Sequence, residues 1–221
     1  MRTNALRLTA AALTVLTLTV ACNDEKTSAP PTHSAPAGGG VDSAAAGLRA
    51  ALTGLLDDHV WLAGNALQTA VLKGGNLKDP QVAGAVTALD ANSVALSKAV
   101  GSVYPDAEKP FLASWRQHVG FFVEYTLGKA TKNSAMVNKA KRDLDGYRTS
   151  FGQLINSVVP ELPADAVAAE LIPHVTSLFA AIDAAVAGSP SFQSKLAAAA
   201  AHMPMTADIL ARGIAKNKNL I

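Results

Sequence analysis

The sequence has a single cysteine, Cys22, and lacks an excess of either charge. With one cysteine, no disulfide can form within the chain, so a hydrophobic core must hold the folded part together. Lys and Arg number 19 against 17 Asp and Glu, and Arg2 and Arg7 lie in a segment that we expect to be removed, which leaves 17 of each sign. A balanced chain without an aromatic and basic strip is not expected to bind nucleic acid.

Several motifs of well-known enzymes are also missing. The chain has no HExxH, no pair of ExxH motifs of the ferritin-like di-iron kind, no CxxCH for covalent haem, no phosphate-binding glycine loop and no GxSxG elbow. No cysteine remains as a thiolate ligand or nucleophile if Cys22 carries lipid. The sequence therefore contains no motif that predicts a particular reaction.

The first 22 residues resemble the export segment of a bacterial lipoprotein. Arg2 and Arg7 are followed by an apolar stretch at 8–21, which is too short to span a membrane as a helix. It ends at Leu18-Thr19-Val20-Ala21-Cys22, which resembles a lipobox, although Thr19 stands where leucine is usual. The resemblance implies a signal peptide at 1–21 and a diacylglycerol thioether on Cys22. Ordinary secretion is the alternative.

This interpretation places the protein in the cell envelope, outside the cytoplasmic membrane. Two or three acyl chains would hold Cys22 firmly to the membrane, which is the one partner that the sequence predicts. Residues 22–41 are rich in Ser, Thr, Pro, Ala and Gly and are expected to form a disordered tether. Residues 42–218 are long enough for one folded domain.

That domain is predicted to be all-α, a six-helix antiparallel bundle of three tandem hairpins in the style of ferritin and hemerythrin. Apolar residues recur at three-four spacing, whereas alternating β-branched runs are absent. Gly and Pro clusters separate the apolar stripes. The stripes cover 48–70, 82–103, 111–126, 137–158, 167–185 and 192–214.

The hairpins also resemble one another as an internal repeat. A histidine lies on the apolar stripe of the first helix of each hairpin, and a polar residue lies at the stripe edge of the second helix. The histidines are His59, His118 and His174, and the partner residues are Asp90, Asp145 and His202. All six lie 10 to 15 residues from their hairpin turns, so we expect them at one height in the bundle.

Such a polar layer inside an apolar bundle must be satisfied. An unpaired buried polar group costs about 1–3 kcal/mol, and a buried carboxylate costs more. The layer is therefore predicted to bind a metal ion, since imidazole and carboxylate suit copper, zinc or iron. A hydrogen-bonded structural layer is the alternative. Non-covalent haem between two histidines is less favoured because the sequence has no specific motif for it.

Five further side chains are candidate accessories of the site. Glu170 is four residues before His174 and can share its helical face, and Pro173 between them is expected to kink the helix. Met203 and Met205 follow His202, and their thioether sulfurs would favour copper(I). Arg148, three residues after Asp145, is an alternative ion partner for that carboxylate. The accessory candidates are Glu170, Met203, Met205, Tyr147 and Arg148.

Three segments carry a resemblance to a known group of proteins. They are Leu55-Leu56-Asp57-Asp58-His59-Val60-Trp61-Leu62-Ala63 with Asn92, the helix end Gly101-Ser102-Val103-Tyr104, and Ala201-His202-Met203. The chain resembles exported bacterial helical proteins that often carry the label "copper amine oxidase". The resemblance implies an extracytoplasmic location and a recurring histidine pattern. Amine oxidase activity is not carried over, because the chain has no Asn-Tyr-Asp/Glu and no His-x-His.

Three functions remain open from the sequence. The first is a metal-binding lipoprotein for storage, sensing or delivery. The second is a helical envelope module that binds a protein partner or small ligand without metal. The third is a redox enzyme, which would need an open coordination position and a substrate cleft.

Overall fold

The computed structural model describes residues 40–220. The predicted signal peptide, Cys22 with its predicted lipid and nearly all of the predicted tether lie outside the described residues. Within the described part every regular element is helical, and no strand occurs there. The predicted all-α fold is therefore confirmed.

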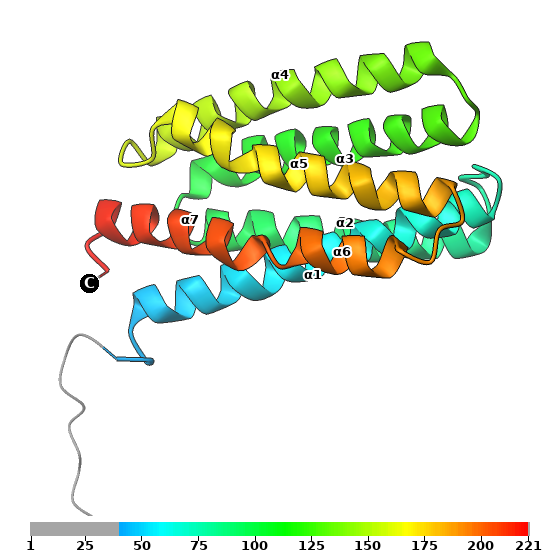
Figure 1. Cartoon of the computed structure of the whole chain (residues 1–221). Coiled ribbons are helices and arrows are strands. Elements are labelled where there is room, and N and C mark those ends of the chain that lie inside the picture. Colours follow the sequence, from blue (N-terminus) through cyan, green and yellow to red (C-terminus); the bar gives the residue numbers. More distant parts are fainter. Residues whose placement is uncertain (1–39, 221) are drawn as a thin grey trace, which may run out of the picture. The chain divides into compact units, whose positions relative to one another are not determined.

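Seven α-helices and one short 3₁₀ helix make up the bundle (Figure 1). Their bounds are α1 Ala44–Leu72, α2 Pro80–Gly101, η1 Pro105–Ala107, α3 Glu108–Ala130, α4 Ser134–Val158, α5 Ala164–Val186, α6 Phe192–Ala200 and α7 Met203–Asn217.

Polar side chains cap the N-termini of α1, α2 and α4. The Ser43 hydroxyl accepts a hydrogen bond from the Ala46 amide at the start of α1, and the Asp79 carboxylate accepts one from the Gln81 amide in α2. These bonds satisfy amides that have no partner within the helix. Gly74 and Gly188 have a φ of 63° just after α1 and α5, a conformation that costs glycine little.

Three antiparallel hairpins follow one another along the chain, as predicted. α1 packs against α2, α3 against α4, and α5 against α6, and each pair is joined by a short connection. The first helices of the hairpins, α1, α3 and α5, also contact one another, and α7 returns along α1. Because α1, α3 and α5 meet, one side chain from each reaches a common point inside the bundle.

The predicted sixth helix is divided into α6 and α7. α6 ends at Ala200, and α7 begins at Met203 with Pro204 in its first turn. A proline has no amide hydrogen, and its ring collides with the carbonyl four residues earlier, which here belongs to Ala200. The break places His202 at the start of α7 instead of in the middle of a helix.

α5 is unusual in two respects. It contains Pro173 and remains helical through it, and its length and apolar composition would allow it to cross a membrane. In the structure α5 contacts α1, α3, α4 and α6, and its residues Leu171, Leu178 and Ile182 are buried. One face of α5 therefore packs into the core, while 33% of its apolar window is buried and Ile172 is 47% exposed.

Candidate metal centre

The three histidines of the first helices are buried at one point of the bundle. His59, His118 and His174 are only 2%, 3% and 6% exposed. On each helix the buried residues recur every three or four positions, and the histidine occupies one of these positions. The imidazole therefore points into the core together with the apolar side chains of the same helix face.

One nitrogen from each histidine lies within 4.8 Å of the other two, and the Nε2 atoms of His59 and His118 are 3.3 Å apart. Two imidazoles that bind one tetrahedral ion at about 2.0–2.1 Å have nitrogens roughly 3.3 Å apart. Across residues 40–220, this is the one cluster of three or more His, Cys, Asp or Glu side chains placed to hold a metal ion. The three buried histidines thus could hold a metal ion.

Aromatic rings enclose the histidines. The Trp115 ring meets His59 and His118 edge-on, with centroids 4.9 and 4.6 Å away, and Tyr147 stacks on His118 at 5.0 Å. The Phe122 ring also meets His118 and His174 edge-on, with ring centroids 6.2 and 6.0 Å apart. These rings restrict the imidazole orientations and keep the cluster in apolar surroundings.

This environment keeps the imidazoles neutral. Burial, followed by positive charge on His174, lowers the pKa of His59 to about 3, while Asn92 opposes the shift. Burial and the charge of His202 lower the pKa of His174 to about 4, and burial lowers the pKa of His118 well below its ordinary value. A neutral imidazole has the free lone pair that a metal ion requires.

The cluster has unused hydrogen-bonding capacity. The Nδ1 atoms of His59, His118 and His174 are buried and have no hydrogen-bond partner. Asn92 of α2 donates from Nδ2 to the Leu55 carbonyl at 3.0 Å, and its Oδ1 is also without a partner. Asn92 lies beside His59 and opposes the fall in the pKa of its imidazole, so this amide is placed to orient the ring.

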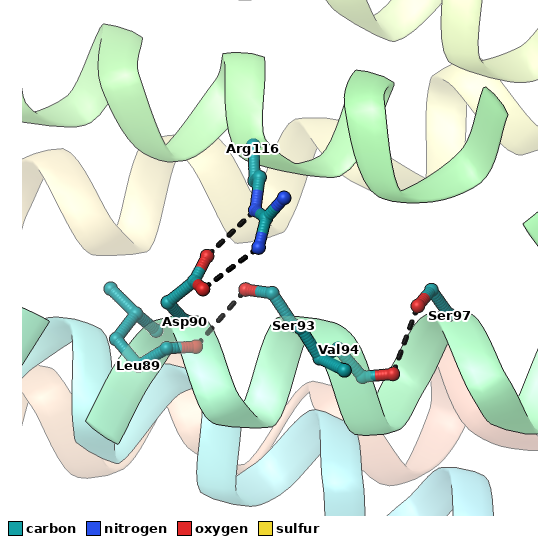
Figure 2. Close-up of polar contacts among 6 residues, drawn as sticks. All are labelled: Leu89, Asp90, Ser93, Val94, Ser97 and Arg116. Carbon is teal, nitrogen blue, oxygen red and sulfur yellow. Dashed lines mark hydrogen bonds and ion pairs between the residues drawn. The ribbon is translucent and has the colours of Figure 1, made fainter. Parts of the chain in front are cut away.

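The structure does not bring Asp90 or Asp145 to the histidines, so the predicted layer of six is corrected to three. The Asp90 carboxylate accepts two hydrogen bonds from Arg116, at 2.7 and 2.8 Å, which holds the pKa of Asp90 below its ordinary value (Figure 2). Asp145 is exposed and pairs with Arg148, the ion partner considered from the sequence. Both aspartates lie on the outer side of their stripes, where a carboxylate needs no metal.

His202 is also outside the cluster and belongs to a separate polar group. Its Nε2 lies 3.1 Å from Glu170 Oε1 and 3.2 Å from the Glu170 carbonyl oxygen, and Thr206 donates to the same carboxylate at 3.1 Å. Glu170 therefore faces His202 instead of the predicted His174. This group adjoins the cluster closely enough for the His202 charge to act on His174.

The remaining accessory candidates divide between core and surface. Met203 is buried and lines a small apolar cavity together with His59 and His174, whereas Met205 is 55% exposed. Tyr147 is part of the aromatic enclosure, and burial raises its pKa well above the ordinary value. Arg148 donates to the Ala168 carbonyl at 3.2 Å and joins α4 to α5.

Two neighbours of the cluster had no site role in the sequence interpretation. Asn92 was noted only as part of a resemblance, and Phe122 only as a residue of its apolar stripe. An asparagine on a stripe of valine, leucine and serine is the one sequence feature that could have identified Asn92, because a buried amide needs a partner.

Comparison with family models, curated proteins and solved structures finds no match for the chain.

Proposed function

We propose that the protein binds one metal ion through His59, His118 and His174 and acts in metal storage, sensing or delivery. The convergence of three buried, neutral imidazoles from three different helices carries this proposal. Each histidine alone fits an ordinary core position. Three that share one point, with one nitrogen of each ring within 4.8 Å of the other two, form a donor set for one metal ion.

The donor set favours an ion of low charge, and copper(I) is our first choice. No carboxylate lies among the three ligands, so a dication would bring its full charge into an apolar interior unless it carried a hydroxide. Imidazole binds copper, zinc and iron, and the buried Met203 thioether near His59 and His174 suits copper(I). Zinc with a fourth, exchangeable ligand is the next choice, and iron follows because non-haem iron commonly takes a carboxylate.

Haem is disfavoured at this centre. The 3.3 Å separation of the His59 and His118 Nε2 atoms leaves no space for a porphyrin between the two rings. Bis-histidine haem would need the helices to move apart.

We also propose that the domain acts outside the cytoplasmic membrane, anchored through Cys22. Arg2, Arg7, the apolar stretch and the cysteine that follows support this location. Labelled palmitate should be incorporated into the full chain expressed in a bacterium, and Cys22→Ser should abolish the labelling. Equal labelling of both chains would overturn the anchor.

A structural layer without metal is the second candidate. The same 3.3 Å separation fits a hydrogen bond from one neutral imidazole to another. The two candidates differ in their response to metal, because a purely structural layer gains no stability from a particular ion.

The test uses the chain from residue 22 onward, with Cys22→Ser and without a histidine tag. We expect one equivalent of bound metal by elemental analysis. At a free concentration of about 100 times Kd, the bound ion should raise the melting temperature by roughly 5–10 °C. Alanine at His59, His118 or His174 should remove both effects, whereas His202→Ala serves as the matched control and should retain them. Equal loss in all four variants, or no bound metal in the parent chain, would contradict the proposal.

A further inference from the structure

A second feature adjoins the histidines and is not used by the metal centre itself. A cavity of about 260 Å³ lies among α1, α2 and α3, and His59 and His118 form part of its wall. Three of the five α1 residues in its wall are alanines, Ala63, Ala66 and Ala70, which leave space beside His59 and Leu67. Native cores rarely leave a space of this size, because each lost contact costs stability.

The cavity runs from the surface to the buried cluster. Leu77 and Val86 line it and are 45% and 43% exposed, whereas His59 and His118 are almost wholly buried. The ion pair between Asp90 of α2 and Arg116 of α3 also lines it and joins the two helices across their gap (Figure 2). Both side chains of the pair are about half exposed, so the pair belongs to the outer end of the cavity.

The wall offers few polar groups to a guest. The hydroxyl of Ser93 donates to the Leu89 carbonyl and that of Thr126 to the Phe122 carbonyl, so both are engaged with their own helices (Figure 2 shows the Ser93 bond). His59 and His118 are the imidazoles at the buried end of the wall; their Nδ1 atoms have almost no accessible surface, so the nitrogens that a guest would address are the Nε2 atoms, which lie 3.3 Å apart.

We propose that this cavity binds a small, uncharged, flat apolar molecule with one polar head directed at the His59–His118 pair. An engineered apolar cavity of about 150 Å³ holds benzene, so about 260 Å³ suits a guest of roughly ten non-hydrogen atoms. A charged head is excluded because the wall is largely apolar, and its ion pair, Asp90 with Arg116, lies at the outer end and is already internally satisfied. The inference goes beyond the proposed function, since the cavity and its histidine wall need no metal.

The test compares naphthalene, 2-naphthol and 2-naphthoate, three probes that share one ring system and differ in the head. Binding to the metal-free chain from residue 22 onward, with Cys22→Ser, is followed by fluorescence or calorimetry. We expect 2-naphthol to bind about fivefold to tenfold more tightly than naphthalene, the contribution of one buried hydrogen bond, and 2-naphthoate not to bind. Failure of 2-naphthol to bind, or equal binding of 2-naphthoate, would overturn the inference.

Two filling variants locate the guest. Ala66→Leu fills the interior of the cavity, and Gly120→Leu adds a side chain at its exposed end, where a Cβ meets open space and the fold should tolerate it. Each should weaken 2-naphthol binding at least tenfold, whereas Ala88→Leu on the exposed side of α2 is the matched control and should not. Unchanged binding in both filling variants would place the guest elsewhere.

The outcome is independent of the metal proposal. Ala66→Leu should keep its one equivalent of metal while losing 2-naphthol, because Ala66 does not belong to the three-histidine cluster. A chain that binds 2-naphthol without binding metal would overturn the proposed function and retain this inference.

Discussion

The Nε2 atoms of His59 and His118 lie 3.3 Å apart, although 59 residues separate them in the sequence. Their helices belong to different hairpins, and His174 from the third hairpin brings its own nitrogen within 4.8 Å of both. The three rings are buried and neutral, and they form a polar centre separate from the group of His202, Glu170 and Thr206.

The free energy of unfolding of the metal-free protein should fall as the pH falls from about 7 to 5. The unfolded chain takes up protons on histidines near pH 6.5, whereas folded His59 and His174 do so only near pH 3 and 4. The unfolded state therefore binds more protons throughout this window, and stability is fully present only above it. At pH 5 we expect a loss of roughly 2 kcal/mol for each of the two histidines, measured by urea denaturation.

The matched variant for this experiment is His59→Leu, which removes one of the titrating groups. Its unfolding free energy should depend on pH less steeply than that of the parent chain, by about one proton between pH 5 and 6. An identical pH dependence in the two chains would show that folded His59 takes up its proton at an ordinary pKa.

Copper(I) bound by the three histidines should quench the fluorescence of Trp115. This ring touches His59 and His118 and is buried, whereas Trp61 is 39% exposed on the outer side of α1. The variant Trp61→Phe should keep the quenching at one equivalent of copper, and Trp115→Phe should lose it. Quenching confined to Trp61 would place the copper at the surface.

Neutralising the two aspartates should leave metal binding unchanged. Asp90 is paired with Arg116 and Asp145 with Arg148, and neither carboxylate belongs to the three-histidine cluster. Asp90→Asn and Asp145→Asn should each keep one equivalent of metal with a Kd within about twofold of the parent, measured by competition with a chelator. A Kd at least tenfold larger in either variant would indicate that the carboxylate is a metal ligand.

The sequence predicted the fold well because the information it needed was local. Three-four apolar spacing and Gly or Pro breaks determined the helices, and short connections made neighbours antiparallel. The sequence analysis did not predict the break at His202. A proline alone does not determine such a break, because α5 continues through Pro173 whereas the chain breaks before Pro204. Which outcome occurs depends on the packing around it.

The centre was predicted in part for the same reason. A histidine in the middle of an apolar stripe must point inward, and this was true of His59, His118 and His174. Asp90 and Asp145 lie at stripe edges, where a rotation of the helix by a small angle decides between core and solvent. Asp90 forms an ion pair with Arg116, which belongs to the next hairpin, and no local sequence pattern predicts that ion pair.

Gly152→Ala should destabilise the bundle by about 1–3 kcal/mol or more, because a Cβ there would lie 2.1 Å from the Ala164 carbonyl oxygen of α5. Gly146→Ala on the same helix meets open space and should instead stabilise it by about 0.5–1 kcal/mol. Chemical denaturation of both variants measures this close approach of α4 to α5, the helix that carries His174. Equal effects of the two substitutions would contradict the packing.

X-ray absorption at the metal edge tests the three-histidine centre most directly, on the tag-free Cys22→Ser chain from residue 22 loaded with one equivalent of copper(I) or zinc. The account predicts about three nitrogen ligands near 2.0 Å with the multiple scattering of imidazole rings, unchanged in His202→Ala, whereas His174→Ala should not hold one equivalent of metal and should lose this signal. A spectrum dominated by oxygen ligands, or one that His174→Ala leaves unaltered, would contradict the account.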